Sequence, residues 1–252
     1  MAGVVGGVIG GMLARVMRAA GVDLRLGVTV SALEGAGGRV RRARLSNGRT
    51  VDADVVLAAT GAVRDVEWLG DSGLAAGPGG IRCDGFCRAR DFSGGVVEGV
   101  FAAGDAAAWP HPLYGGRMTA LEHWGNAVEQ AAAAAHNMMS PPESMVGYGW
   151  LPAFWSSQFG LNIKGVGLPD GADRMVIAHG NPRENRFVAV FGGKGRTLAA
   201  LSVNSCRWLP AYKEPIIRGD PFPSIRQGVD GTRFTAVSPE WPTHRARPGG
   251  QT

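Results

Sequence analysis

Cysteine is scarce in this chain of 252 residues. The three cysteines, Cys83, Cys87 and Cys206, are odd in number and form no Cys-x-x-Cys spacing. This argues against a disulfide framework and against a cysteine-based zinc site. It also favours a reducing, cytoplasmic compartment. We expect Cys83 and Cys87 to be strand residues that pack in the core.

Several other signals are missing as well. No apolar run approaches the roughly 18 residues of a membrane span, so we expect no membrane partner. The histidines show no metal-ligand spacing, and no serine lies in a Gly-x-Ser-x-Gly elbow. Basic residues are not interleaved with aromatic ones, which argues against a nucleic-acid partner.

Glycine, in contrast, is abundant. The chain has 40 glycines, well above the usual share of roughly 7%, which predicts many tight turns. Hydrophobic residues make up 45% of the chain and charged residues 19%, as in a globular protein of one large or two small domains. The net charge of +5 suits an acidic protein partner or a phosphate-bearing ligand.

Hydrophobic periodicity predicts alternating helices and strands. A helix is expected from about residue 4 to Gly21, followed by strands near 22–30, 30–33 and 40–45, with a hairpin turn at Asn47-Gly48. The apolar run 55–59 is typical of a buried parallel strand. Further expected elements are strands at 81–87, 97–102, 176–178, 186–191 and 197–203, and helices at 118–139 and 204–213.

One short stretch, VFAAGDAAAWP at residues 100–110, places a lone carboxylate at the end of an apolar strand. Gly104 permits close backbone approach, and Asp105 falls at the carboxyl end of a strand, where open α/β sheets bind ligands. A carboxylate there can accept hydrogen bonds from sugar or ribityl hydroxyls. The alternative is that Asp105 caps the turn or the next helix, and the spacing alone leaves both interpretations open.

Four segments, taken in order, carry a family resemblance. They are VVLAATGAVRDVEWL at 55–69, GVFAAGDAAAWP at 99–110, ALEHWGNAVEQA at 120–131 and PAFWSSQFGLNIKGVG at 152–167. Together they resemble the FAD-dependent NAD(P)H:ferredoxin reductases of the pyridine nucleotide-disulfide oxidoreductase superfamily, of the type that serves Rieske oxygenases and cytochromes P450. The resemblance implies an α/β fold: part of a flavoprotein with two dinucleotide-binding domains, and a small α+β reductase domain at the C-terminus.

The resemblance also implies roles for individual residues. Asp105 would bind the flavin ribityl chain, and Gly104 would allow the close approach. The N-terminus of the helix after Glu122 would point its partial positive charge at the isoalloxazine. The residues implied in cofactor binding are Thr60, Gly61, Gly104, Asp105, Glu122, Trp124 and Trp155. Together with Gln158, Trp155 would close the flavin site from the C-terminal domain.

Some of these residues have simpler interpretations. Trp124 is otherwise a core aromatic, Glu122 a helix-capping or dipole-stabilising residue, and Trp155 a domain-interface residue. No catalytic side chain is expected, because the flavin performs the chemistry.

The sequence departs from the family pattern in two places. It contains no Gly-x-Gly-x-x-Gly turn, so the helix N-terminus that holds a pyrophosphate is expected to be missing. Arg64-Asp65 also replaces a frequent Pro-Asn. We interpret the chain as starting partway through the NAD domain: residues 1–66 would be a remnant of that domain, 67–146 the end of the FAD domain, 147–218 the reductase domain and 219–252 a loosely held tail.

The first functional hypothesis is an FAD-dependent oxidoreductase that passes electrons from NAD(P)H to a ferredoxin-type iron–sulfur protein. The chain would then be a fragment, a sequence with a misassigned start, or a split gene product whose N-terminal half is a separate chain. The second hypothesis is a decayed remnant or non-catalytic subunit that acts as an interaction module.

Overall fold

The computed structural model describes residues 2–223 and 235–237. The chain divides into two compact units: unit 1 comprises Met1–Leu13 and Arg64–Thr252, and unit 2 comprises Ala14–Val63. Most of the expected tail, namely 224–234 and 238–252, lies outside the described residues. Within the described part, no helix has the length and apolar character that crossing a membrane requires.

The first helix and the meander of unit 2 follow local signals. Helix α1 spans Ala2–Ala19 and ends just before Gly21, whose φ of +85° suits a helix terminus. Strands β1 (Val30–Ala36), β2 (Arg39–Leu45) and β3 (Thr50–Asp52) form an antiparallel sheet in that order. The expected Asn47-Gly48 turn joins β2 to β3, with Gly48 at a φ of +81°.

Two strands expected near this meander do not form. Residues 55–59 have no strand assignment, and Val55 and Leu57 are 84% and 88% exposed. A buried parallel strand needs partners on both sides, and no described segment pairs with this run. Residues 22–29 also lack a strand assignment, and Leu26 is 68% exposed.

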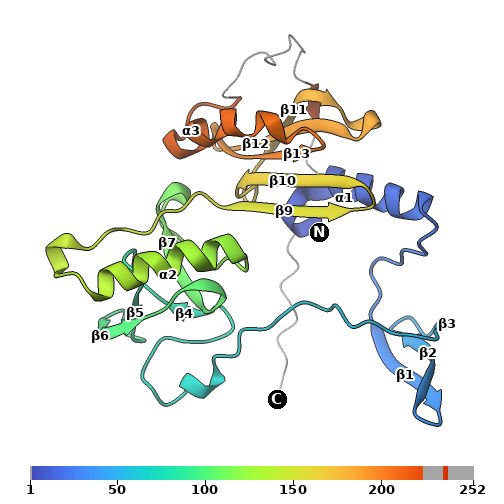
Figure 1. Cartoon of the computed structure of the whole chain (residues 1–252), viewed down its shortest axis with the longest axis horizontal. Coiled ribbons are helices and arrows are strands. Elements are labelled where there is room, and N and C mark those ends of the chain that lie inside the picture. Colours follow the sequence, from blue (N-terminus) through green and yellow to red (C-terminus); the bar gives the residue numbers. More distant parts are fainter. Residues whose placement is uncertain (1, 224–234, 238–252) are drawn as a thin grey trace. The chain divides into compact units, whose positions relative to one another are not determined.

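The middle of unit 1 consists of short strands, 3-10 turns and one long helix (Figure 1). The 3-10 turns are η1 (Glu67–Leu69), η2 (Gly104–Ala106), η3 (Pro112–Tyr114) and η4 (Pro142–Ser144). Strands β4 (Ile81–Arg82), β7 (Ala107–His111) and β8 (Arg117–Thr119) form one sheet, and β5 (Arg88–Arg90) pairs with β6 (Val96–Phe101). The strand expected at 81–87 is therefore shorter: Cys87 lies in a turn with a φ of +68°, although both Cys83 and Cys87 are buried.

Helix α2 runs from Trp124 to Met138, so the expected start at Met118 is wrong. Met118 instead belongs to β8, which pairs with β7 in an antiparallel hairpin. Gly115 and Gly116, both with positive φ, turn the chain between these strands. Two adjacent glycines mark a turn, but they do not by themselves show that a strand, and not a helix, follows.

The C-terminal part of unit 1 is an antiparallel sheet. Within the described residues it has the order β14-β11-β12-β13-β10-β9. The strands span Ala153–Gln158 (β9), Leu161–Gly167 (β10), Arg174–Asn181 (β11), Arg186–Gly193 (β12), Arg196–Val203 (β13) and Thr235–Val237 (β14). The strands expected at 176–178, 186–191 and 197–203 are confirmed. In place of the helix expected at 204–213 are a turn, η6 (Cys206–Trp208), and helix α3 (Pro210–Arg218).

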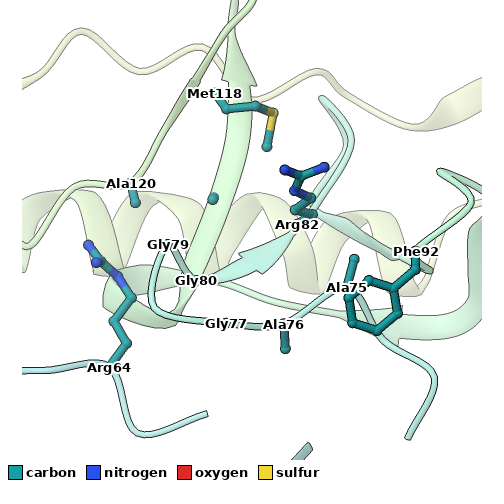
Figure 2. Close-up of a pocket in the computed structure, with 11 residues that line it drawn as sticks. Arg64, Ala75, Ala76, Gly77, Gly79, Gly80, Arg82, Phe92, Met118 and Ala120 are labelled. Atoms are coloured by element: carbon teal, nitrogen blue, oxygen red, sulfur yellow. The ribbon is translucent and has the colours of Figure 1, made fainter. Parts of the chain in front are cut away.

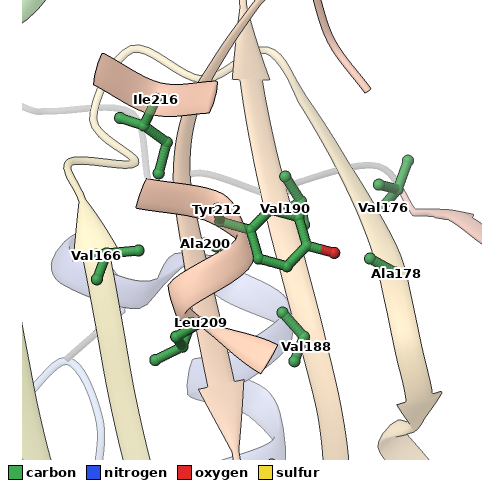
Figure 3. Close-up of a cluster of buried hydrophobic side chains, with 9 residues drawn as sticks. All are labelled: Val166, Val176, Ala178, Val188, Val190, Ala200, Leu209, Tyr212 and Ile216. Atoms are coloured by element: carbon green, nitrogen blue, oxygen red, sulfur yellow. The ribbon is translucent and has the colours of Figure 1, made fainter. Parts of the chain in front are cut away.

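Helix α3 covers one face of this sheet. Figure 3 shows Tyr212 and Ile216 of α3, and Leu209 just before it, pointing toward the valines and alanines of β10 to β13. This cluster is buried, with Val188 fully enclosed. The C-terminal sheet therefore has a hydrophobic core of its own.

Candidate functional site

The Gly104-Asp105 turn is seated directly on helix α2. Gly104 has a φ of +73°, and a Cβ there would lie 3.2 Å from the Cβ of Ala127. Its backbone N–H donates to Oε1 of Gln130 at 2.9 Å. Glycine is therefore required both by backbone conformation and by close packing on the helix, and the turn is fixed beside the first turns of α2.

Asp105 itself remains accessible. Its side chain is exposed, and no hydrogen bond from a described residue reaches its carboxylate. Turn η2 has no side-chain cap, and its N-cap residue is Ala103. The capping alternative for Asp105 is therefore wrong for this turn and for α2, whose cap is a different residue.

His123 caps helix α2. Its Nδ1 accepts the backbone N–H of Gly125 at 3.1 Å. The ring stacks on Trp150 at 6.3 Å between centroids and meets Trp155 edge-on at 4.8 Å. Partial burial lowers the pKa of His123, and the negative charge of Asp105 acts in the opposite direction. Sequence reasoning missed this histidine because it searched only for metal-ligand spacing.

Glu122 does not cap the helix. Its carboxylate forms an ion pair with Arg64, at 2.9 Å between Oε1 and Nη2. The same guanidinium donates from Nε to the backbone oxygen of Asp105 at 2.6 Å and from Nη1 to that of Pro78 at 3.2 Å. Arg64 was noted in the sequence only as a departure from the family pattern, yet it joins three separate segments.

The two tryptophans predicted at the site are both largely exposed. Trp124, the first residue of α2, is 74% exposed and Trp155 is 58% exposed. Trp124 is therefore no core aromatic in this chain, and Trp155 touches His123. Thr60 and Gly61 belong to unit 2 and are exposed, and their role in cofactor binding stays a prediction.

A stripe of buried polar residues along α2 holds the surrounding loops. Asn126, Gln130 and Asn137 are at most 1% exposed. Asn126 Oδ1 accepts the hydroxyl of Tyr148 at 2.9 Å, and the amide of Asn137 donates to the backbone oxygens of Phe86 and Val146. Asn126 and Asn137 thereby provide hydrogen-bond partners to polar groups whose burial without a partner would be costly. The stripe was not predicted, because hydrophobic periodicity does not detect polar residues that face inward.

Two cavities adjoin the place where the Gly104-Asp105 turn meets the N-terminus of α2, which we call the corner. One of about 440 Å³ is lined by residues that include Glu122, His123, Trp150 and Phe154. The other, of about 630 Å³, is lined in part by Arg64, the glycines of residues 77–80, Arg82 and Phe92. Figure 2 shows Arg64 at one side of this second pocket and Arg82 with Phe92 at the other.

The hairpin before α2 is fastened to the C-terminal part of unit 1. His111 is fully buried, and its Nε2 lies 3.1 Å from the oxygen of Trp150. Burial lowers the pKa of His111 to about 4. Tyr114 accepts the N–H of Leu168 at 2.7 Å, and burial raises its pKa to about 12. These contacts join the segment before α2 to Trp150 and Leu168.

The exposed Asp105 follows the end of strand β6, and open α/β sheets bind ligands outside the carboxyl ends of their strands. The chain belongs to the family of pyridine nucleotide-disulphide oxidoreductases, whose model matches residues 3–131. A second model, the reductase C-terminal domain, matches residues 153–228. The resemblance inferred from the four segments is thereby confirmed, and so is the α/β fold class.

Related proteins agree with this assignment. A probable ferredoxin reductase of Castellaniella defragrans is 35% identical, over 86% of this chain and 51% of its own length. The ferredoxin–NAD(+) reductase component of an anthranilate 1,2-dioxygenase system from Burkholderia cepacia is 32% identical, over 89% of this chain and 52% of its own length.

A solved ferredoxin reductase from Rhodopseudomonas palustris superimposes with a TM-score of 0.75 at 26% identity, covering 89% of this chain and 55% of that one. Putidaredoxin reductase in its covalent complex with putidaredoxin gives 0.73 at 27% identity, covering 85% of this chain and 49% of that one. The chain spans about half the length of the relatives it matches.

Proposed function

We propose that this chain is the C-terminal half of an FAD-dependent NAD(P)H:ferredoxin reductase. The proposal rests mainly on the corner, where Asp105 and the N-terminus of α2 lie together. The close packing of Gly104 on Ala127 holds the turn in this place. A helix N-terminus carries roughly half a positive charge. An exposed carboxylate next to it offers a hydrogen-bond acceptor for hydroxyls beside a site that favours negative charge.

The residues of this corner fit FAD. The Asp105 carboxylate is exposed and accepts no hydrogen bond from the described residues, so it can accept bonds from the ribityl hydroxyls. Trp124 and Trp155 expose large aromatic surfaces of the kind that cover a flat ring system. Gln158, which lies on β9 with Trp155, is proposed to close the site from the C-terminal part.

FAD bound here would supply the redox chemistry, in which the two electrons of NAD(P)H pass singly to two one-electron iron–sulfur acceptors and one proton is released. The chain's own residues bind and orient the cofactor and set its electrostatic environment. An acidic ferredoxin suits the net positive charge of the chain. Relatives named as ferredoxin reductases support this choice of partner.

We assign Thr60 and Gly61 to cofactor binding at the end of the nucleotide-binding part. We also propose the division at residues 66, 146 and 218 into nucleotide-binding remnant, FAD-binding part, reductase domain and tail. Because the relatives are about twice as long, a separate chain that supplies the N-terminal half is a further proposed partner. A reducing, cytoplasmic compartment is proposed from the unpaired cysteines.

A second function, that of a non-catalytic interaction module, has one supporting observation. The C-terminal sheet has its own buried core under α3, so this part could bind a partner without a flavin.

The visible absorption spectrum of the purified chain separates the two proposals. Flavin bands at about one FAD per chain, bleached by NAD(P)H when the complementary N-terminal half of a relative is added, support the reductase. A colourless chain that takes up no added FAD, with or without that half, supports the interaction module.

A further inference from the structure

Arg64 lies where three segments of unit 1 meet. Its side chain is only 16% exposed, and each of its three nitrogens contacts a different group. These groups are the carboxylate of Glu122, the backbone oxygen of Asp105 and the backbone oxygen of Pro78. Figure 2 shows the arginine next to Ala120 and to the glycines of residues 77–80.

Glu122 places a negative charge close to the N-terminus of α2. It lies two residues before Trp124, the first residue of α2, and its side chain is 50% exposed. An unpaired carboxylate there would oppose the partial positive charge of the helix N-terminus. Any negative charge held at this corner would then be repelled.

Arg64 neutralises this negative charge in this chain. Its ion pair cancels the charge of Glu122, and its bond to the Asp105 backbone fixes the turn that bears the second carboxylate. A lysine could not make the same set of contacts, because its single ammonium is a point charge, whereas the planar guanidinium presents donors in several directions.

We propose that Arg64 is a positioning residue that keeps the N-terminus of α2 electropositive and thereby raises the reduction potential of the bound flavin. The inference rests on the proposed function, since it concerns negative charge on a reduced isoalloxazine. It adds a residue that the family pattern does not supply, because Arg64 stands where that pattern often has proline. Arg64 acts through Glu122 and Asp105.

The test measures the midpoint potential of FAD bound to the chain, alone or together with the N-terminal half of a relative. Four proteins are compared: the wild type, Arg64→Ala, Glu122→Gln and the double variant. Arg64→Ala leaves Glu122 unpaired, so we expect reduced FAD to lose at least about tenfold in affinity relative to oxidised FAD, a fall of about 30 mV. Glu122→Gln alone should raise the potential, and the double variant should return it close to the wild-type value.

The matched control is Arg218→Ala. Arg218 lies at the end of α3 and forms an ion pair with Asp220 at 2.8 Å, so this variant also removes an arginine from a pair with a carboxylate. Its potential should equal that of the wild type. FAD bound with the same potential in the wild type, Arg64→Ala and Glu122→Gln overturns this inference and leaves the proposed function standing. A wild-type chain that binds no FAD, either alone or with the N-terminal half of a relative, overturns the proposed function and the inference with it. If Arg64→Ala does not fold, an unchanged potential in Glu122→Gln still refutes the charge argument.

Discussion

Buried His111 makes the stability of the fold depend on pH. The imidazole has no exposed surface, its Nε2 faces the oxygen of Trp150, and Nδ1 meets no hydrogen-bond partner among the described residues. Burial is the main cause that lowers its pKa from 6.5 to about 4, and the nearby cation Arg117 acts in the same direction. Protonation at Nδ1 would place an unpaired charge in the core.

The sign of the effect follows from proton counting. Between pH 6.5 and 4 the unfolded chain binds a proton at His111 and the folded chain does not, so stability falls as the pH falls. Each pH unit in this window costs about 1.4 kcal/mol, so the full loss is about 3 kcal/mol.

Urea unfolding followed by tryptophan fluorescence, at pH values from about 7.5 down to about 4.5, measures this loss. The comparison protein is His111→Gln, whose amide can still donate to the oxygen of Trp150 but does not titrate in this range. We expect the variant to be less stable than the wild type at neutral pH and to lose less stability on acidification. If the difference in unfolding free energy between the two proteins is the same at every pH, the reasoning fails.

Two further substitutions test the supports of the site. Gly104→Ala should destabilise the chain by about 2–4 kcal/mol, from the left-handed backbone and the contact with α2. Gly115→Ala, at a φ of +67° in open space, should cost only about 1–2 kcal/mol, and equal losses would disprove the packing argument. Tyr114→Phe removes the acceptor of the Leu168 N–H and should lower the free energy of unfolding by about 1 kcal/mol. An unchanged urea midpoint would show that this bond contributes nothing.

Elements with strong local signals could be predicted from the sequence. The Asn47-Gly48 hairpin needs only two residues to define its turn, and β12 and β13 are apolar strands that pair with each other. The alanine run in α2 has high helix propensity. In contrast, the run at residues 55–59 has the composition of a buried strand, yet it finds no partner strand among the described residues.

Only part of the site could be predicted. Residues marked by a local sequence pattern were found, whereas residues whose role depends on long-range contacts were missed. Gly104 and Asp105 were recognised from their place after an apolar strand. The ion pair of Arg64 with Glu122 spans 58 positions of sequence, and no local pattern links the two residues. His123 was missed for a related reason: an N-cap histidine is unusual, and its contacts with Trp150 and Trp155 come from the C-terminal part.

The central claim is that Asp105 and the N-terminus of α2 together hold a flavin. Titration of the apo-chain with FAD, followed by quenching of flavin fluorescence, tests it most directly when the wild type is compared with Asp105→Ala. Since the carboxylate is exposed and accepts no bond from described residues, the variant should keep its thermal stability and lose at least about tenfold in FAD affinity, which is about 1.4 kcal/mol. Equal affinity in the two proteins, at equal stability, would contradict the account.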